Sequence, residues 1–111
     1  MSIHGEAMID WNQIRELRSA TGKEDFAVIV DLFLEEVEES LRNLENRTGA
    51  EDLRAGLHFL KGSALNLGFT GLSCLCQQGE RTGTMDIAEI RGCFARSRAD
   101  FLAGLGLCEE S

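Results

Sequence analysis

Residues 53–68 read LRAGLHFLKGSALNLG, and their apolar positions decide the fold class. The apolar side chains recur at steps of three and four residues, which places them on one face of a helix at about 100° per residue. This apolar arc consists of Leu53, Leu57, Leu60, Ala64 and Leu67. Thr48-Gly49-Ala50-Glu51 is a helix-start signal and Gly68 a helix-stop signal. We therefore predict a helix between them that packs one face into a core.

A short helix is predicted before this stretch. Asp10 is expected as its N-cap, with Gln13 three residues later and Ile9 and Ile14 in contact across the cap. The helix is expected to end near Thr21-Gly22, because glycine commonly follows the last helical residue.

Three further helices are predicted from the same periodicity. Thr21 and Glu24 form a capping-box pattern that opens a long acidic helix. Its apolar positions are Phe26, Val30, Phe33, Val37, Leu41 and Leu44. The next helix is expected to end at Gly83 and carries Phe69, Leu72, Leu75 and Cys76. The last is expected to begin near Thr84 and carries Ile87, Ile90, Phe94, Phe101 and Leu105. The predicted fold is all-α, an up-and-down antiparallel four-helix bundle with a short additional N-terminal helix.

Length and composition indicate one domain. The 111 residues include 43% hydrophobic residues, enough for a core, and neither Pro nor Tyr. We expect a flexible leader at 1–9, the bundle at 10–107 and a C-terminal tail at 108–111. No run reaches the roughly 20 apolar residues of a membrane span and the N-terminus lacks a secretory signal, so we expect a cytoplasmic protein. The net charge of −8 argues against nucleic acid. A monomer that binds neither nucleic acid nor membrane is expected.

The four cysteines do not predict a metal site. Their arrangement is a C-x-C pair followed by two isolated residues, which matches no zinc signature. They are Cys74, Cys76, Cys93 and Cys108. Free thiols are expected. A metal site that combines His58 with cysteines is disfavoured, because helical spacing sends Cys76 inward and His58 outward.

His58 lies more than 100° from the middle of the apolar arc, so we expect it to face solvent or a partner. The residues predicted on the same side are Arg54, Lys61, Gly62, Leu65 and Phe69. Lys61 places a cation within reach of a group bound at the imidazole. Gly62 destabilises a helix by about 1 kcal/mol relative to Ala, and its benefit is a gap beside the ring. Leu65 adds exposed apolar surface of the kind that a partner covers.

The stretch His58-Phe59-Leu60-Lys61-Gly62-Ser63, with Gly68 ten residues after the histidine, resembles the signature of histidine phosphotransfer (HPt) domains. Residues that resemble the next helix of that family are Leu72, Cys76 and Glu80. The resemblance covers about residues 10–106. The chain departs from the pattern at Leu57, where many relatives carry Ala, and at Gly56 within the helix. These two positions leave the local packing and the fit to partners open.

The resemblance implies that His58 accepts a phosphoryl group from the aspartyl phosphate of a response-regulator receiver domain and passes it to another receiver. Lys61 would support the phosphohistidine, Gly62 would leave room for the receiver, and Ser63 and Asn66 would assist. The partner-binding residues expected are Arg54, Gly62, Ser63, Leu65, Asn66 and Phe69. A sensor or hybrid histidine kinase is expected upstream. We expect no cofactor in this chain, Mg²⁺ on the receiver, and a phosphate carrier rather than an autonomous kinase.

Two other functional classes compete with this interpretation. The dimerising hairpin of a sensor kinase would carry an acidic residue after the histidine and a nearby proline, whereas this chain has Phe59 and no proline. A sensor kinase also needs an ATP-binding domain, and this chain has no Gly-rich phosphate loop that would indicate one. A non-catalytic helical adaptor that binds receivers or kinases without phosphotransfer would use the same face, so the sequence leaves this alternative open.

Overall fold

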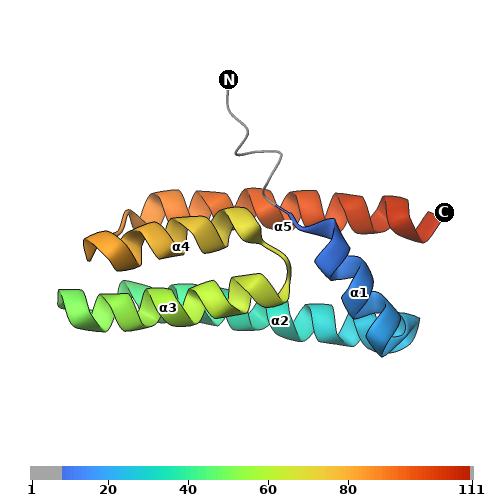
Figure 1. Cartoon of the computed structure of the whole chain (residues 1–111), viewed down its shortest axis with the longest axis horizontal. Helices are drawn as coiled ribbons and strands as arrows, with labels where there is room; N and C mark the ends of the chain where they lie inside the picture. Colours follow the sequence, from blue (N-terminus) through green and yellow to red (C-terminus); the bar gives the residue numbers. More distant parts are fainter. Residues whose placement is uncertain (1–8, 111) are drawn as a thin grey trace, which may run out of the picture.

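The computed structural model describes the backbone of residues 9–110 and side chains as far as residue 105. Within these residues the chain forms five helices and no strand (Figure 1). The helices are α1 (Trp11–Thr21), α2 (Lys23–Glu45), α3 (Ala50–Asn66), α4 (Thr70–Thr82) and α5 (Ile87–Glu110). The predicted all-α fold class is confirmed.

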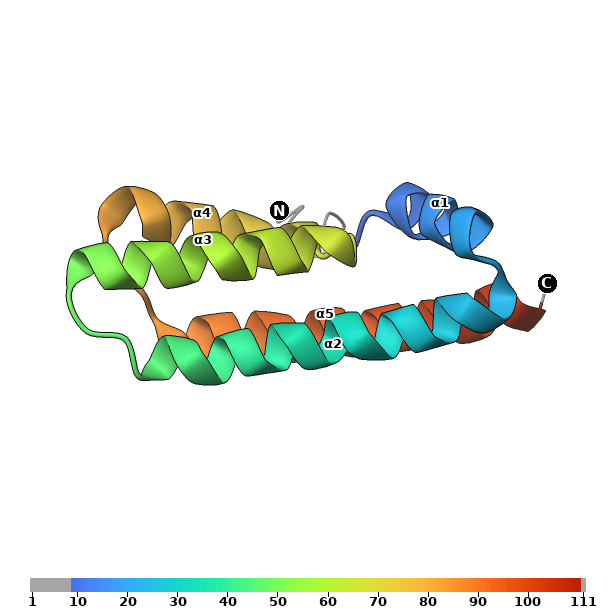
Figure 2. The same cartoon turned by 90° about the horizontal axis from the view of Figure 1, so that it is seen from below.

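The four longer helices form the predicted up-and-down bundle. In Figure 2, α3 and α4 lie side by side in one layer, and α2 and α5 lie side by side in the other. The α3–α4 pair packs most extensively. Ion pairs between Glu45 and Arg91 and between Glu38 and Arg98 link α2 to α5. Short connections force consecutive helices to run antiparallel.

The short helix α1 fills a space left by unequal helix lengths. α2 has 23 residues and α3 has 17, so at about 1.5 Å per residue α2 extends roughly 9 Å further. α1 lies at this end, beyond α3 (Figure 2). It buries Ile14 and stacks Trp11 on Phe101, with ring centroids 6.1 Å apart. The predicted cap is confirmed, because the Asp10 carboxylate accepts a hydrogen bond from the Gln13 amide at 3.3 Å.

The core contains the apolar stripe predicted for α3. Leu57, Leu60, Ala64 and Leu67 are buried, and Leu53 is partly buried against them. Residues from the other helices complete the core, including Ile14, Phe26, Val37, Leu41, Leu44, Leu72, Cys76, Phe94 and Phe101. Amphipathic spacing therefore identified the buried faces correctly.

The predicted thiol state holds for the three cysteines whose side chains are described. Cys74, Cys76 and Cys93 are free thiols, the first exposed and the other two buried. Burial raises the pKa of Cys76 to about 12, because the thiolate is disfavoured in the apolar core. Cys76 is therefore a core residue with an unreactive thiol.

The start of α2 differs from the prediction. Thr21 does not cap this helix, because its hydroxyl donates to the Leu17 carbonyl at 2.9 Å in the last turn of α1. Gly22 separates the two helices with φ +88° and offers no side-chain cap to α2. The predicted capping box of Thr21 and Glu24 is therefore wrong, although the helix itself is present.

The start of α5 also differs. The helix begins at Ile87 rather than near Thr84. The cap is Asp86, whose carboxylate accepts hydrogen bonds from the amides of Ala88 and Glu89 at 3.0 and 3.2 Å. An Asp cap satisfies amides that the first helical turn leaves without partners, and this fixes the boundary.

The ends of the bundle differ slightly from the predicted domain limits. Residues 1–8 and 111 lie outside the described residues, and with them most of the predicted leader. Ile9 packs against the core, so it belongs to the bundle. α5 reaches Glu110, beyond the predicted limit at residue 107. In the described part of the chain, no helix combines the length and apolar character needed to cross a membrane.

Candidate functional site

His58 lies on the outer face of α3, and its side chain is 71% exposed. Its neighbours Leu57 and Leu60 are fully buried on the opposite face. The prediction that His58 points away from the core is confirmed. An imidazole in this position is open to a macromolecular partner.

Glu80 of α4 joins His58 and Lys61 into one cluster. Its Oε1 lies 3.1 Å from Nδ1 of His58, and its Oε2 lies 2.9 Å from Nζ of Lys61. His58 and Lys61 are one helical turn apart on α3, so one carboxylate on the facing helix reaches both. The Glu80 side chain is only 22% exposed. The site therefore spans the α3–α4 interface.

The charge on Glu80 determines which nitrogen of His58 carries the proton. Desolvation raises the pKa of Glu80, but interactions with Lys61 and His58 lower it more, so its pKa lies below the ordinary value of 4.5. Glu80 is therefore ionised near neutral pH, and a carboxylate only accepts hydrogen bonds. Nδ1 of His58 must then be the donor. In the neutral ring, the free lone pair lies on Nε2.

Arg54 contacts the backbone of the same glutamate. Its Nε donates a hydrogen bond to the Glu80 carbonyl oxygen at 2.9 Å. Arg54 is otherwise exposed and lies one turn before His58 on α3. Three α3 side chains, from Arg54, His58 and Lys61, thus contact one residue of α4.

An exposed surface surrounds the imidazole, and we call it the His58 face. It consists of Arg54, His58, Phe59, Gly62, Leu65 and Asn66, all exposed on α3. A Cβ at Gly62 would meet no atom within 4 Å, so the predicted gap is present. Leu65 and Phe59 are 45% and 56% exposed, which is high for large apolar side chains. Phe59 belongs to this surface although it is not among the predicted partner-binding residues.

Two predicted partner-binding residues do not lie on this surface. Ser63 is 4% exposed and Phe69 is fully buried, so both predictions are wrong. The angular extrapolation from His58 fails for Phe69 because α3 ends at Asn66 and Gly68 turns the chain with φ +71°. Phe69 instead packs edge-on against Phe101, with ring centroids 5.5 Å apart.

The two positions left open by the sequence have defined packing. A Cβ at Gly79 of α4 would lie 2.6 Å from Cδ1 of Leu57, so the large residue on α3 fits because its neighbour is small. A Cβ at Gly56 would lie 2.8 Å from Cδ of Arg47 and 2.9 Å from Cδ1 of Leu44. Leu57 and Gly56 are therefore accommodated without disturbing His58.

Glu80 is a site residue that was not predicted, although the sequence carries a signal for it. Glu80 follows Leu72 and Cys76 at steps of four, so it continues the buried stripe of α4. A carboxylate on such a stripe needs a cationic or hydrogen-bonding partner, because burying an unpaired charge is unfavourable. The cations of α3 would have been the first candidates.

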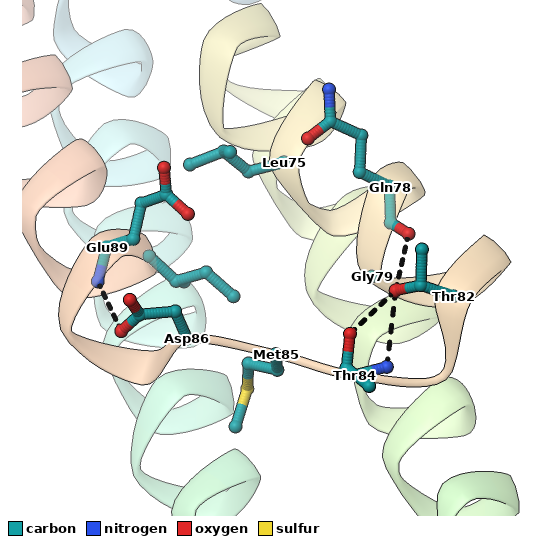
Figure 3. Close-up of a pocket in the computed structure, with 9 residues that line it drawn as sticks. Leu75, Gln78, Gly79, Thr82, Thr84, Met85, Asp86 and Glu89 are labelled. Atoms are coloured by element: carbon teal, nitrogen blue, oxygen red, sulfur yellow. Dashed lines mark hydrogen bonds between the residues drawn. The ribbon is translucent and has the colours of Figure 1, made fainter.

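The pockets of the described residues lie away from His58. A pocket of about 360 Å³ is located between the end of α4 and the start of α5 (Figure 3). Its hydroxyls are engaged with each other, with 2.9 Å between Oγ1 of Thr82 and Oγ1 of Thr84, and Asp86 caps α5. Its lining includes no Lys, Arg or His. Side chains of the described residues form no group of three or more His, Cys, Asp or Glu suited to a metal ion.

Comparison with protein families gives a match for most of this bundle. Residues 28–100 match the model of the Hpt domain. This range covers more than half of the chain and includes His58, Lys61 and Glu80. Comparison with curated proteins and with solved structures finds no match.

Proposed function

The chain belongs to the Hpt domain family, and from this premise we propose that it is a phosphotransfer protein of a two-component phosphorelay. His58 accepts a phosphoryl group from the aspartyl phosphate of a response-regulator receiver domain and passes it to another receiver. The observation that carries this proposal is an exposed imidazole whose Nδ1 is bound to an ionised carboxylate.

The chemistry follows from the proton on Nδ1. The lone pair of Nε2 attacks phosphorus in line with the leaving group. An Nε2–P bond forms, the bond between phosphorus and the aspartyl oxygen breaks, and the aspartate leaves as a carboxylate. No proton needs to leave the ring, because Nδ1–H stays hydrogen-bonded to Glu80. Glu80 also stabilises the positive charge that the ring acquires, which is electrostatic preorganisation.

Lys61 supports the phosphorylated state. Its Nζ is held 2.9 Å from Glu80, one turn from His58, so a cation is already near the ring before phosphate arrives. Phosphoryl transfer depends mainly on positioning and on neutralising charge at the phosphoryl oxygens. Lys61 supplies that charge with little further loss of side-chain entropy, because its side chain is already held by Glu80.

The His58 face supports receiver docking. Phe59 and Leu65 offer apolar contact area, and Gly62 lets another backbone approach the imidazole. The proposed partners are receiver domains and a sensor or hybrid histidine kinase in the cytoplasm, and the proposed state of this chain is a monomer. Mg²⁺ belongs to the receiver, and this chain is proposed to carry phosphate without a cofactor of its own.

Transfer from a phosphorylated receiver tests this function. The full chain is incubated with a panel of ³²P-labelled receiver domains from the source organism in the presence of Mg²⁺. The expected result is an acid-labile, base-stable label on the chain, which is lost in His58→Gln and retained in His4→Gln, the variant of its second histidine. A label that survives His58→Gln contradicts the proposal. Receiver binding without any label would instead indicate a non-catalytic adaptor.

A further inference from the structure

The end of α4 would leave an unpaired backbone carbonyl without help from α3. The helix ends at Thr82, and Gly83 caps it with φ +73° while its amide donates to the Gly79 carbonyl. If the helix continued, the amide of Thr84 would donate a hydrogen bond to the Glu80 carbonyl. That amide donates instead to the Thr82 hydroxyl at 3.3 Å. The last carbonyls of a helix need outside donors for this reason.

Arg54 is the donor for this carbonyl. Its Nε lies 2.9 Å from the Glu80 oxygen, and the guanidinium lies against Gly83, where a Cβ would come within 2.7 Å of Nη2. A cation at a helix C-terminus is also favoured by the helix dipole. Arg54 therefore fixes the last turn of α4 against α3.

The residue whose backbone Arg54 holds is the residue whose carboxylate orients His58. Glu80 has contacts at both ends: its carbonyl with Arg54, and its carboxylate with His58 and Lys61. Without the backbone contact, the last turn of α4 is held to α3 by side-chain interactions alone. The carboxylate then samples positions in which Nδ1 of His58 is not bound.

We propose that Arg54 is a positioning residue: by holding the Glu80 carbonyl, it keeps the Glu80 carboxylate on Nδ1 of His58. The expected effect of Arg54 on the phosphotransfer rate rests on the proposed function. Its expected effect on the position of the Glu80 carboxylate does not. It assigns Arg54 a role within the chain that differs from its predicted role in partner binding.

Two uncharged substitutions separate the hydrogen bond from the charge. In Arg54→Gln, the amide nitrogen occupies the same place along the side chain as Nε of arginine, so it can donate to the carbonyl. In Arg54→Met, a methyl group occupies that place and cannot donate. Arg81→Met removes a positive charge from the exposed neighbour of Glu80 and serves as the charge control. Circular dichroism checks that all variants fold.

The first readout is the ¹⁵N NMR spectrum of the His58 imidazole near neutral pH. Wild type, Arg54→Gln and Arg81→Met are expected to show the tautomer with Nδ1 protonated. Arg54→Met is expected to shift toward the mixed tautomers of a free histidine. The second readout is the phosphotransfer rate at saturating receiver concentration, which is expected to be roughly tenfold to a hundredfold lower in Arg54→Met than in Arg54→Gln, since both variants lack the charge and only Arg54→Gln keeps the donor.

The outcomes are distinguishable. A wild-type imidazole spectrum in Arg54→Met overturns the inference, and so does equal loss in Arg54→Gln and Arg54→Met, because the hydrogen bond would then not be the cause. If Arg54→Met does not fold, a disturbed spectrum in folded Arg54→Gln overturns it and an intact one supports it. Failure of the wild type to accept phosphate removes the proposed function, while the spectra still decide the role of Arg54.

Discussion

At the scale of single residues, the site consists of an exposed histidine and a mostly buried carboxylate that sets its proton. Helical geometry placed His58 correctly from the sequence, because the apolar arc of α3 is strong and continuous. The partner of His58 lies 22 residues away on another helix, and its contact depends on the register of α3 against α4. Sequence spacing within one helix does not define that register.

Lys61 is expected to act on the phosphoryl group more than on the fold. Lys61→Ala should slow transfer from a phosphorylated receiver by about tenfold or more, because one cation near the phosphoryl oxygens is lost. Thermal unfolding should show that Lys61→Ala still folds, with some loss of stability because Glu80, whose side chain is 22% exposed, loses its cationic partner. Lys23→Ala, the variant of the chain's other lysine, is the control. A normal transfer rate in Lys61→Ala would remove Lys61 from the mechanism.

The lowered pKa of Glu80 predicts a pH dependence of stability. A carboxyl group whose native pKa is depressed stabilises the fold fully above its unfolded pKa, and this stability is lost as pH falls through the native pKa. For Glu80 the loss begins near the ordinary value of 4.5 and continues below it. Urea unfolding of wild type and Glu80→Gln is measured at about pH 7 and about pH 3.5. The difference in free energy of unfolding between wild type and Glu80→Gln should be smaller at the lower pH. Glu39→Gln, at an exposed site, should have the same free energy of unfolding as wild type at both pH values.

At the scale of helices, two glycines with opposite surroundings give a matched comparison. Gly62 lies in open space on α3, so Gly62→Ala should raise the free energy of unfolding by up to about 1 kcal/mol. Gly79 on α4 lies against Leu57 and the Thr84 carbonyl, so Gly79→Ala should lower it by about 1–3 kcal/mol through overpacking. Chemical denaturation measures both changes. Equal effects at the two positions would contradict the packing described for α3 and α4.

The same open space predicts that Gly62 is kept for docking rather than for stability. Gly62→Gln should leave the fold intact and slow transfer, because the longer side chain fills the gap beside His58 where a receiver approaches. Affinity for a receiver, measured by calorimetry, should fall with the rate. Tight binding by Gly62→Gln would show that the gap has no role in docking.

Helix existence could be predicted from the sequence more reliably than helix ends. The apolar stripes of the four longer helices are set by local periodicity, and each one is buried or partly buried in the structure. The ends depend on which polar group takes the first free amides, and Asp86 rather than Thr84 does so in α5. Phe69 was misplaced because its direction depends on the turn at Gly68 and on the aromatic cluster it enters. These are tertiary effects that a single helical wheel does not contain.

At the scale of the whole molecule, the buried thiols report on global unfolding. Cys76 has its pKa raised to about 12 by burial in the core, whereas Cys74 is exposed on the same helix. Near neutral pH, a thiol reagent should therefore modify Cys74 quickly, and Cys76 only at the rate at which the bundle opens. Mass spectrometry of peptides after timed labelling separates the two sites. Equal labelling rates in the native protein would contradict a closed core around α4.

The bundle as a whole gives His58 a rigid support. The α3–α4 pair holds both halves of the site, and α2, α5 and α1 cover the remaining faces of the core. A site built on packed helices keeps its geometry better than one on loops, which suits a reaction governed by positioning. The central claim is then a single bond: phosphorus joined to Nε2 of His58.

The most direct measurement is NMR of the phosphorylated chain with ¹⁵N-labelled histidine. After transfer from a receiver, one-bond ³¹P–¹⁵N coupling should appear at Nε2 of His58, and Nδ1 should keep its proton and its hydrogen bond to Glu80. Coupling to Nδ1, or phosphorus on any other residue, would contradict the account.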